Sequence, residues 1–290
     1  MKVLLTGGCG NIGRRVLAWL EPAHEVVVAD AVPHPLGWPG RVELLDLTRS
    51  EDLDRLDEPF DAVVHLAAIP NPFRDPWEEV LRVNLQSTFN VLRWASARGV
   101  PKVIFGSSES ASGWGIHAKW YQPDYLPIDE RHRDVPAEVY SFTKSFGDQL
   151  CQGFSREHGL RTICLRYTFV TFEALYEGFL RTLQSPGPRD ALGTFYAWID
   201  AEDVASAVLA SLDYDPGEGA SETFYLTARD HYGTVDTLDL ITRNWGDAVR
   251  VDADYYAERP RGSFFDIRKA EQVLGWKPEW DLERLVRERG

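Results

Sequence analysis

A glycine-rich turn near the N-terminus constrains the fold of this chain more than any other feature. The turn contains Gly7, Gly10 and Gly13, follows the apolar run at residues 3–5, and precedes apolar residues at helical spacing from 12 to 20. This pattern predicts a strand, a tight turn and a helix. Gly7 permits the turn, Gly10 lets the backbone approach a pyrophosphate, and Gly13 lets the helix pack on the strand. The unpaired N–H groups at the helix N-terminus would face the phosphates.

An acidic residue completes the pattern of a dinucleotide-binding unit. A second apolar strand is expected at residues 25–29, and Asp30 follows it. This position, about 20 residues after the turn, is where a carboxylate accepts a hydrogen bond from a ribose hydroxyl. Asp30 should repel a ribose phosphate and therefore favours NAD, although Arg14 and Arg15 leave NADP possible.

Composition limits the class of protein and its partners. The 290 residues suit a nucleotide-binding core with a smaller appendage, and no apolar stretch is long enough to predict a membrane span. The first residues lack the pattern of a signal peptide, and Cys9, Cys151 and Cys164 lack metal-ligand spacing. We therefore expect a cytoplasmic protein with reduced thiols and no metal. The net charge of −14 argues against a nucleic-acid partner but does not exclude an anionic substrate.

Strands and helices alternate along most of the chain, which predicts an α/β fold with a doubly wound parallel sheet of the Rossmann type. We expect residues 1–167, completed by 195–228, to form the dinucleotide-binding domain. Residues 168–194 and 229–290 would form a smaller C-terminal substrate lobe. Strands are predicted at residues 3–5, 25–29, 42–45, 62–66, 102–105, 162–165, 195–199 and 223–226.

A tyrosine and a lysine on a predicted helix could transfer a proton. Tyr140 and Lys144 are four residues apart, so both side chains lie on one face of the helix expected at residues 137–158. A nearby ammonium group favours the phenolate and lowers the pKa of a tyrosine from its usual value near 10. Ser108 follows a predicted strand and could orient the reacting oxygen. Such a pair also occurs by chance, and serines after strands often only cap turns.

Taken together, these residues resemble the extended short-chain dehydrogenase/reductase family, the NAD-dependent epimerase/dehydratase group. The resemblance covers nearly the whole chain. Its further marks are Asp46-Leu47, His65 to Ala68, Asn84, Ser107-Ser108, Leu165 to Tyr167, Trp198 to Ala205, and Leu274 to Pro278.

The resemblance implies roles for individual residues. Asp46 and Leu47 would border the adenine, Leu66 to Ala68 would line the cofactor groove, and Lys144 would also hold the nicotinamide ribose. The predicted catalytic residues are Ser108, Tyr140 and Lys144. The predicted cofactor contacts are Gly7, Gly10, Asn11, Ile12, Gly13, Asp30, Asp46, Leu47, Leu66, Ala67, Ala68, Asn84, Tyr140, Lys144 and Tyr167.

Other polar residues of the pattern are expected to be structural. His65 is interpreted as a packed strand histidine, and Asp200 and Asp203 as residues that stabilise a helix start. Arg181 or Arg261 could meet a substrate carboxylate or phosphate, but exposed arginines are common.

Departures from the family pattern concern the substrate. Sugar-nucleotide epimerases of this family typically have an Asn-Pro after the segment that here ends at Tyr167, whereas this chain has Thr168 and Phe169. Phe169 cannot donate the hydrogen bond that helps to hold a substrate diphosphate. The stretch from Phe105 to Trp114 also resembles, less closely, uronate dehydrogenases of the same superfamily, which oxidise a free sugar acid.

We therefore expect an NAD-dependent oxidoreductase that acts on a secondary hydroxyl or carbonyl group of a sugar derivative. One alternative is a nucleotide-sugar epimerase or dehydratase that retains NAD, and another is a non-catalytic NAD(P)-binding protein. By resemblance, the helices expected at residues 77–98 and 137–158 could also pair with their copies in a homodimer. Their simpler role is to cover the sheet.

Overall fold

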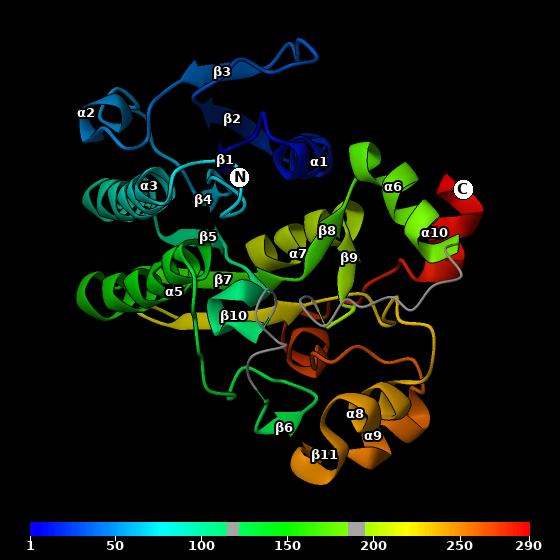
Figure 1. The fold of residues 1–290 in the computed structure, drawn as a ribbon. Coiled ribbons are helices and arrows are strands. Elements are labelled where there is room, and N and C mark those ends of the chain that lie inside the picture. The colour runs from blue at the N-terminus through cyan, green and yellow to red at the C-terminus, as the bar shows by residue number, and fades with distance from the viewer. Residues whose placement is uncertain (115–121, 185–194) are drawn as a thin grey trace.

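Seven parallel strands form the central sheet of the protein. The computed structural model describes residues 1–114, 122–184 and 195–290. The strands of the sheet are β1 (Lys2–Thr6), β2 (Glu25–Asp30), β3 (Arg41–Leu44), β4 (Ala62–His65), β5 (Lys102–Gly106), β7 (Arg161–Tyr167) and β10 (Ser221–Leu226). Their order is β10-β7-β5-β4-β1-β2-β3, and every neighbouring pair is parallel (Figure 1). The predicted doubly wound fold is confirmed.

The strand order reverses next to β1. The chain moves from β1 to β2 and β3 in one direction and then returns to place β4 on the other side of β1. In open α/β sheets ligands bind at such a switch point, beyond the carboxyl ends of the strands. The fold therefore places the candidate site where β1, β4 and β5 end.

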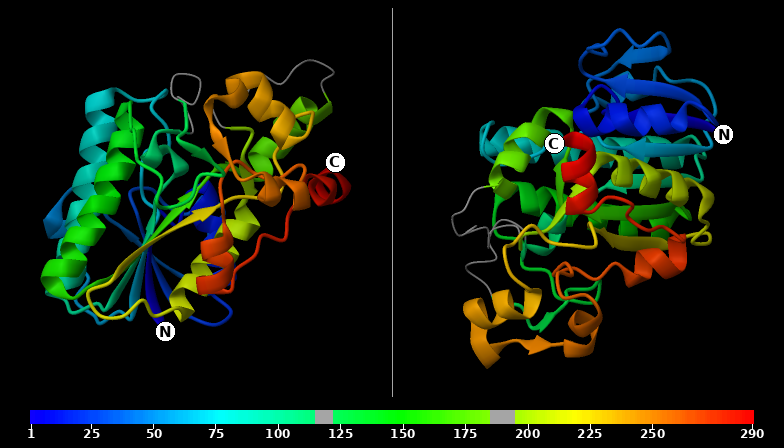
Figure 2. Two further views of the ribbon diagram at one scale, coloured as in Figure 1. Left: turned by 90° about the horizontal axis from the view of Figure 1, so that it is seen from below. Right: turned by 90° about the vertical axis from the view of Figure 1, so that its right-hand side faces the viewer.

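Helices cover both faces of this sheet, which explains why its central strands are apolar on both sides. One face packs against α1 (Asn11–Leu20) and α7 (Ala201–Asp213). The other packs against α2 (Ser50–Leu53), α3 (Trp77–Ala97) and α5 (Val139–His158). In the left view of Figure 2, α3 in cyan and α5 in green lie side by side.

A second apolar cluster, rich in aromatic residues, lies beyond the sheet. It includes the buried rings of Trp114, Phe195, Trp198, Phe264 and Phe265. Its elements are β6 (Tyr125–Leu126), α6 (Glu173–Gln184), β9 (Trp198–Asp200), α8 (Thr237–Trp245), β11 (Arg250–Val251), α9 (Ala253–Glu258) and α10 (Leu282–Arg289). The strand β8 (Phe169–Thr171) pairs with β9. Short helical turns are η1 (Glu109–Ser112), η4 (Gly246–Ala248) and η5 (Ala270–Leu274). Aromatic residues of the predicted substrate lobe, such as Tyr176 and Phe179, thus fill a core. Residues 115–121 and 185–194 lie outside the described residues.

The strand predicted at residues 195–199 differs from the structure. Phe195 and Tyr196 have φ values of 49° and 53°, which are left-handed and incompatible with a strand. The strand begins only at Trp198 and pairs with β8 in a separate two-stranded sheet. The chain rejoins the central sheet at β10.

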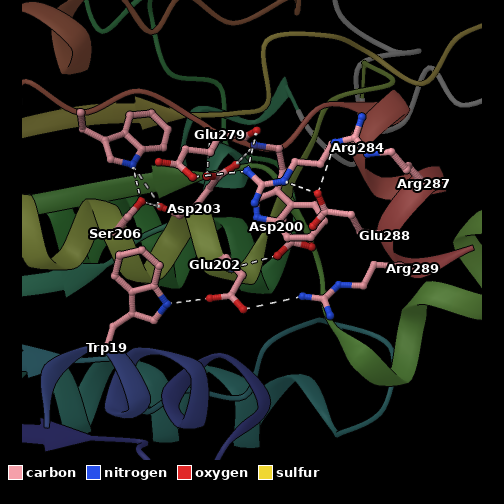
Figure 3. A network of polar contacts seen from close by, with 12 residues as sticks. Trp19, Asp200, Glu202, Asp203, Ser206, Glu279, Arg284, Arg287, Glu288 and Arg289 are labelled. Atoms are coloured by element: carbon pink, nitrogen blue, oxygen red, sulfur yellow. Dashed lines mark hydrogen bonds and ion pairs between the residues drawn. The ribbon is translucent and has the colours of Figure 1, made fainter. Parts of the chain in front are cut away.

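Two aspartates at the start of α7 connect distant parts of the chain (Figure 3). Asp200 caps the helix by accepting a hydrogen bond from the Glu202 N–H and also accepts one from the Tyr176 hydroxyl. Asp203 accepts hydrogen bonds from the backbone N–H groups of Glu279 and Trp280, at 2.8 and 3.0 Å. Asp200 thus stabilises the helix start, as the sequence predicted. Asp203 is also structural, but it fixes the distant backbone at residues 279 and 280 instead of the helix start.

Within the described residues, no helix combines the length and apolar character needed to cross a membrane.

Candidate active site

The glycine turn between β1 and α1 is too tight for side chains. Gly7 has a φ of 72°, and a Cβ there would lie 2.6 Å from the backbone nitrogen of Ala67. Gly10 is the N-cap of α1 and offers no side chain to the free N–H groups of the first turn, where Asn11 and Ile12 lie. This uncapped helix start beside a close-packed backbone fits a dinucleotide pyrophosphate.

The residues predicted to contact the adenosine half lie at the ends of β2 and β3. Asp30 is the last residue of β2, the strand next to β1. Its carboxylate accepts a hydrogen bond from the Cys9 N–H at 3.0 Å, which holds it against the glycine turn. Asp46 is exposed, and its hydrogen bond from the Thr48 hydroxyl keeps the pKa of the carboxyl below its usual value. Leu47 beside it is buried. Arg15, which left NADP open, forms ion pairs with Glu173 and Glu202.

The residues after β4 border the same crevice. Leu66, Ala67 and Ala68 are partly exposed and follow β4 at the carboxyl edge. Asn84 in α3 is buried, and its amide group bonds to both backbone polar groups of Ile69 and to the Thr143 hydroxyl. Asn84 therefore fixes the loop after β4 against α5.

A capping box fixes the start of α5 and with it Tyr140. The Glu138 carboxylate accepts hydrogen bonds from the N–H groups of Tyr140 and Ser141, at 2.7 and 2.6 Å. The Ser141 hydroxyl in turn accepts one from the Glu138 N–H at 3.0 Å. The backbone N–H groups at the helix start thus have hydrogen-bond acceptors, so the helix begins at a defined residue.

The structure brings the three predicted catalytic residues together where β5 ends. Ser108, Tyr140 and Lys144 are all buried. The ammonium group of Lys144 lies 5.7 Å from the centre of the Tyr140 ring and donates a hydrogen bond to the Gly106 carbonyl oxygen at 2.6 Å. Tyr167 ends β7 close by, because its hydroxyl would be 2.9 Å from a Cβ at Gly106.

The electrostatics of this cluster differ from the sequence expectation. Burial raises the pKa of Tyr140 well above its usual value, Tyr167 and Glu109 add to this effect, and a hydrogen bond with Ser108 opposes it. Burial also lowers the pKa of Lys144 to about 8. Lys144 directs its ammonium group to a backbone carbonyl, so in the structure it does not lower the tyrosine pKa below its usual value.

Sequence reasoning missed one functional candidate, Glu109. This buried side chain accepts a hydrogen bond from the Ser108 hydroxyl at 2.8 Å, and burial raises the pKa of its carboxyl to about 7. The signal was present in the sequence, because Glu109 directly follows the expected catalytic serine. Its burial was not, because that comes from the packing of η1 against α5 and β7.

The remaining candidates have other contacts. His65 is buried in the sheet between the hydroxyls of Thr6, at 2.7 Å, and Thr88, at 3.2 Å, as a packed strand histidine. Arg181 is exposed and pairs with Glu177 on α6. Arg261 donates its hydrogen bonds to the backbone carbonyls of His231 and Gly233.

Comparison with known proteins identifies the family. The model of the NAD-dependent epimerase/dehydratase family matches residues 3–224. A putative UDP-glucose 4-epimerase of Methanocaldococcus jannaschii is 26% identical over 319 residues, covering 98% of this chain and 96% of that protein. A uronate dehydrogenase of Pseudomonas syringae pv. tomato is 27% identical over 169 residues, covering 57% of this chain and 58% of that protein.

A solved structure shares the fold over the whole chain. It is a short-chain dehydrogenase/reductase superfamily protein from Agrobacterium tumefaciens with bound NAD, and it has a TM-score of 0.75 at 22% identity, covering 99% of this chain and 95% of its own. The family match spans most of the chain and includes the glycine turn, Ser108, Tyr140 and Lys144. The chain therefore belongs to the NAD-dependent epimerase/dehydratase family of enzymes.

Proposed function

We propose that the protein oxidises or reduces a secondary alcohol or carbonyl carbon of a sugar or sugar acid, using NAD. The observation that carries this proposal is the meeting of the Ser108 and Tyr140 side chains at the carboxyl edge of the sheet, one helical turn from Lys144. NAD, when bound, supplies the carbon that accepts or returns hydride. Tyr140 exchanges a proton with the substrate oxygen, Ser108 orients that oxygen, and Lys144 holds the nicotinamide ribose.

A free sugar is favoured over a nucleotide sugar by the segment that follows β7. Phe169 lies there with 38% of its surface exposed, in a position where the resemblance leads us to expect a hydrogen-bonding Asn-Pro. An exposed aromatic ring can stack on a sugar face but cannot bond to a diphosphate. The similarity to a uronate dehydrogenase over part of the chain supports the same substrate class.

The test follows the absorbance of NADH while purified protein and NAD are incubated with free aldoses, uronic acids and nucleotide sugars. We expect NAD to be reduced by a free sugar or sugar acid. Tyr140→Phe should lower kcat by about 10²-fold or more, because it removes a positioned acid–base group, while NAD binding persists. An enzyme that binds NAD but turns over none of these compounds would contradict the proposal and favour a non-catalytic NAD-binding protein.

A second candidate is a nucleotide-sugar epimerase that retains its NAD. The similarity to a putative UDP-glucose 4-epimerase over 98% of this chain favours it. The same experiment separates the two, because an epimerase interconverts two nucleotide sugars without net formation of NADH.

We also propose that α3 and α5 form a homodimer interface. Phe89 on α3 is 41% exposed and Phe146 on α5 is 43% exposed, and both line one apolar groove between the two helices. Exposed apolar patches of this kind commonly mark protein–protein contacts.

A further inference from the structure

The Ser108 hydroxyl has only one proton to donate, and it donates this proton to the carboxylate of Glu109. The Ser108 hydroxyl donates to Glu109 at 2.8 Å and accepts from the backbone N–H of Ser110 at 3.1 Å. While Glu109 is ionised, Ser108 therefore cannot also donate to Tyr140. In this state the phenol can only donate to the serine oxygen. The arrangement that lowers the pKa of Tyr140, in which Ser108 donates to the tyrosine oxygen, becomes available once Glu109 is protonated.

The charged and titratable groups around Glu109 are few, and Ser108 links its carboxylate to Tyr140. The elements packed against η1 are α5 and β7. From α5, Tyr140 and Glu138 face the carboxylate, and from β7, Tyr167 does. Asp134, in the segment beside η1, is held by Arg166 at 2.7 Å. None of the described ion pairs involves Glu109. The Ser108 hydroxyl is the side-chain partner of this buried carboxylate, and the backbone N–H groups of Ser110 and Glu109 also stabilise its ionised form.

We propose that Tyr140, Ser108 and Glu109 form a hydrogen-bonded chain that moves the proton released from the substrate hydroxyl onto Glu109. This inference rests on the proposed function. During oxidation, the C–H bond of the alcohol carbon breaks and hydride passes to NAD. The substrate O–H proton moves to Tyr140, the phenol proton to Ser108, and the serine proton to the Glu109 carboxylate. Charge balances because NAD gains the hydride and Glu109 gains the proton; reduction runs the chain backwards.

The chain explains how a buried tyrosine can act without becoming a stable phenolate. Burial and Glu109 both raise the pKa of Tyr140, so its ionised form is scarce at neutral pH. A tyrosine that releases one proton while it receives another need not ionise. Glu109 does not touch the substrate and acts through Ser108. The protonation state of Glu109 therefore controls the proton transfer from the substrate.

Kinetics as a function of pH test the chain. With the sugar that reduces NAD, we expect the kcat of the wild type to fall as the pH drops below about 7, where Glu109 is protonated. Glu109→Gln should lower kcat by about 10²-fold and lose this acid limb, because the amide cannot accept the proton. Its KM for NAD should change less than twofold. Glu109→Asp should keep the limb with an intermediate kcat.

Two further variants keep the test informative. Ser108→Ala breaks the chain but retains Glu109, so it should also lose the acid limb. The matched control is Glu130→Gln: burial raises the pKa of Glu130 too, but it bonds to the Tyr225 N–H, outside the cluster. It should keep the wild-type profile. An acid limb that survives in Glu109→Gln or in Ser108→Ala would overturn the proposal.

Infrared difference spectra between pH 5.5 and 8.5 detect the protonation of the Glu109 carboxyl in the absence of substrate. We expect a protonated-carboxyl C=O band that is missing in Glu109→Gln and shifted in Ser108→Ala. A wild type without this band would overturn the proton acceptor, whatever the enzyme oxidises. A wild type with the band but without turnover of any sugar would instead overturn the proposed function.

Discussion

Single residues decide how closely two loops approach at the cofactor end of the site. Gly7 combines a left-handed backbone with a position that has no room for a side chain, because a Cβ there would lie 2.6 Å from the backbone nitrogen of Ala67. Gly99 has a similar φ of 67°, but a Cβ there would meet nothing within 4 Å. An alanine at Gly99 would therefore cause backbone strain alone, whereas an alanine at Gly7 would cause the same strain and a steric clash.

We predict that Gly7→Ala loses NAD binding and that Gly99→Ala does not. Gly99→Ala should cost only about 1–2 kcal/mol of unfolding free energy, which is the strain of a left-handed alanine. Gly7→Ala carries the same strain and must also push the loop after β4 away from the turn. Calorimetric titration with NAD and urea unfolding measure the two effects. Equal NAD affinity in both variants would show that the turn does not hold the cofactor.

His65 provides a prediction about stability at acid pH. Burial lowers the pKa of His65 to about 3, whereas the unfolded chain has the usual value near 6.5. The folded state keeps the imidazole neutral, so its stabilising contribution is present above pH 6.5 and is lost as the pH falls towards 3. Between pH 7.5 and 5.0 this single group should cost about 2 kcal/mol of unfolding free energy.

The measurement compares urea unfolding of the wild type and His65→Gln at both pH values. Glutamine keeps a donor and an acceptor for the Thr6 and Thr88 hydroxyls but does not titrate. The variant should lose about 2 kcal/mol less than the wild type on acidification. An identical loss in both proteins would mean that His65 is protonated in the folded state.

The candidate site shows which residues a sequence can predict. Tyr140 and Lys144 follow from helical spacing, and the glycines follow from the turn that they permit. Glu109 could not be assigned in this way, because its raised pKa depends on burial by residues more than 25 positions away in the chain. For the same reason, sequence alone suggested that Lys144 lowers the tyrosine pKa, whereas burial dominates in the structure.

At the scale of elements, apolar periodicity predicted the central strands and long helices, because each packs against its neighbours in a regular way. It failed at residues 195–197, where two left-handed residues form a turn inside an apolar run. A buried turn and a buried strand have the same composition, so only tertiary packing separates them.

The paired helices α3 and α5 carry the prediction about assembly. We expect the double variant Phe89→Glu/Phe146→Glu to weaken a homodimer at least about 30-fold, because two aromatic contacts would become buried charges. Light scattering after size-exclusion chromatography measures the change. The control is Leu238→Glu on α8, which is 39% exposed but lies outside the groove and should leave the mass unchanged. A wild type that is monomeric would refute the interface.

At the scale of the whole molecule, the segment at residues 276–280 packs against α7, which covers one face of the central sheet. Trp276 donates a hydrogen bond to the Ser206 hydroxyl at 2.9 Å, and Asp203 binds the backbone at Glu279 and Trp280. These contacts join residues 70 or more positions apart and attach α10 next to α7 (Figure 3). The segment therefore depends on one buried carboxylate as well as on apolar packing.

We predict that Asp203→Ala lowers the unfolding free energy by about 3 kcal/mol, because the part-buried N–H group of Glu279 and the buried one of Trp280 lose their acceptor. The matched control is Asp213→Ala at the exposed end of the same helix, which should change stability by less than about 0.5 kcal/mol. Urea unfolding measures the total effect, and hydrogen exchange at the Glu279 and Trp280 amides reports whether the segment detaches first. If these amides stay protected in Asp203→Ala, apolar packing around Trp276 and Trp280 holds the C-terminal segment without the carboxylate.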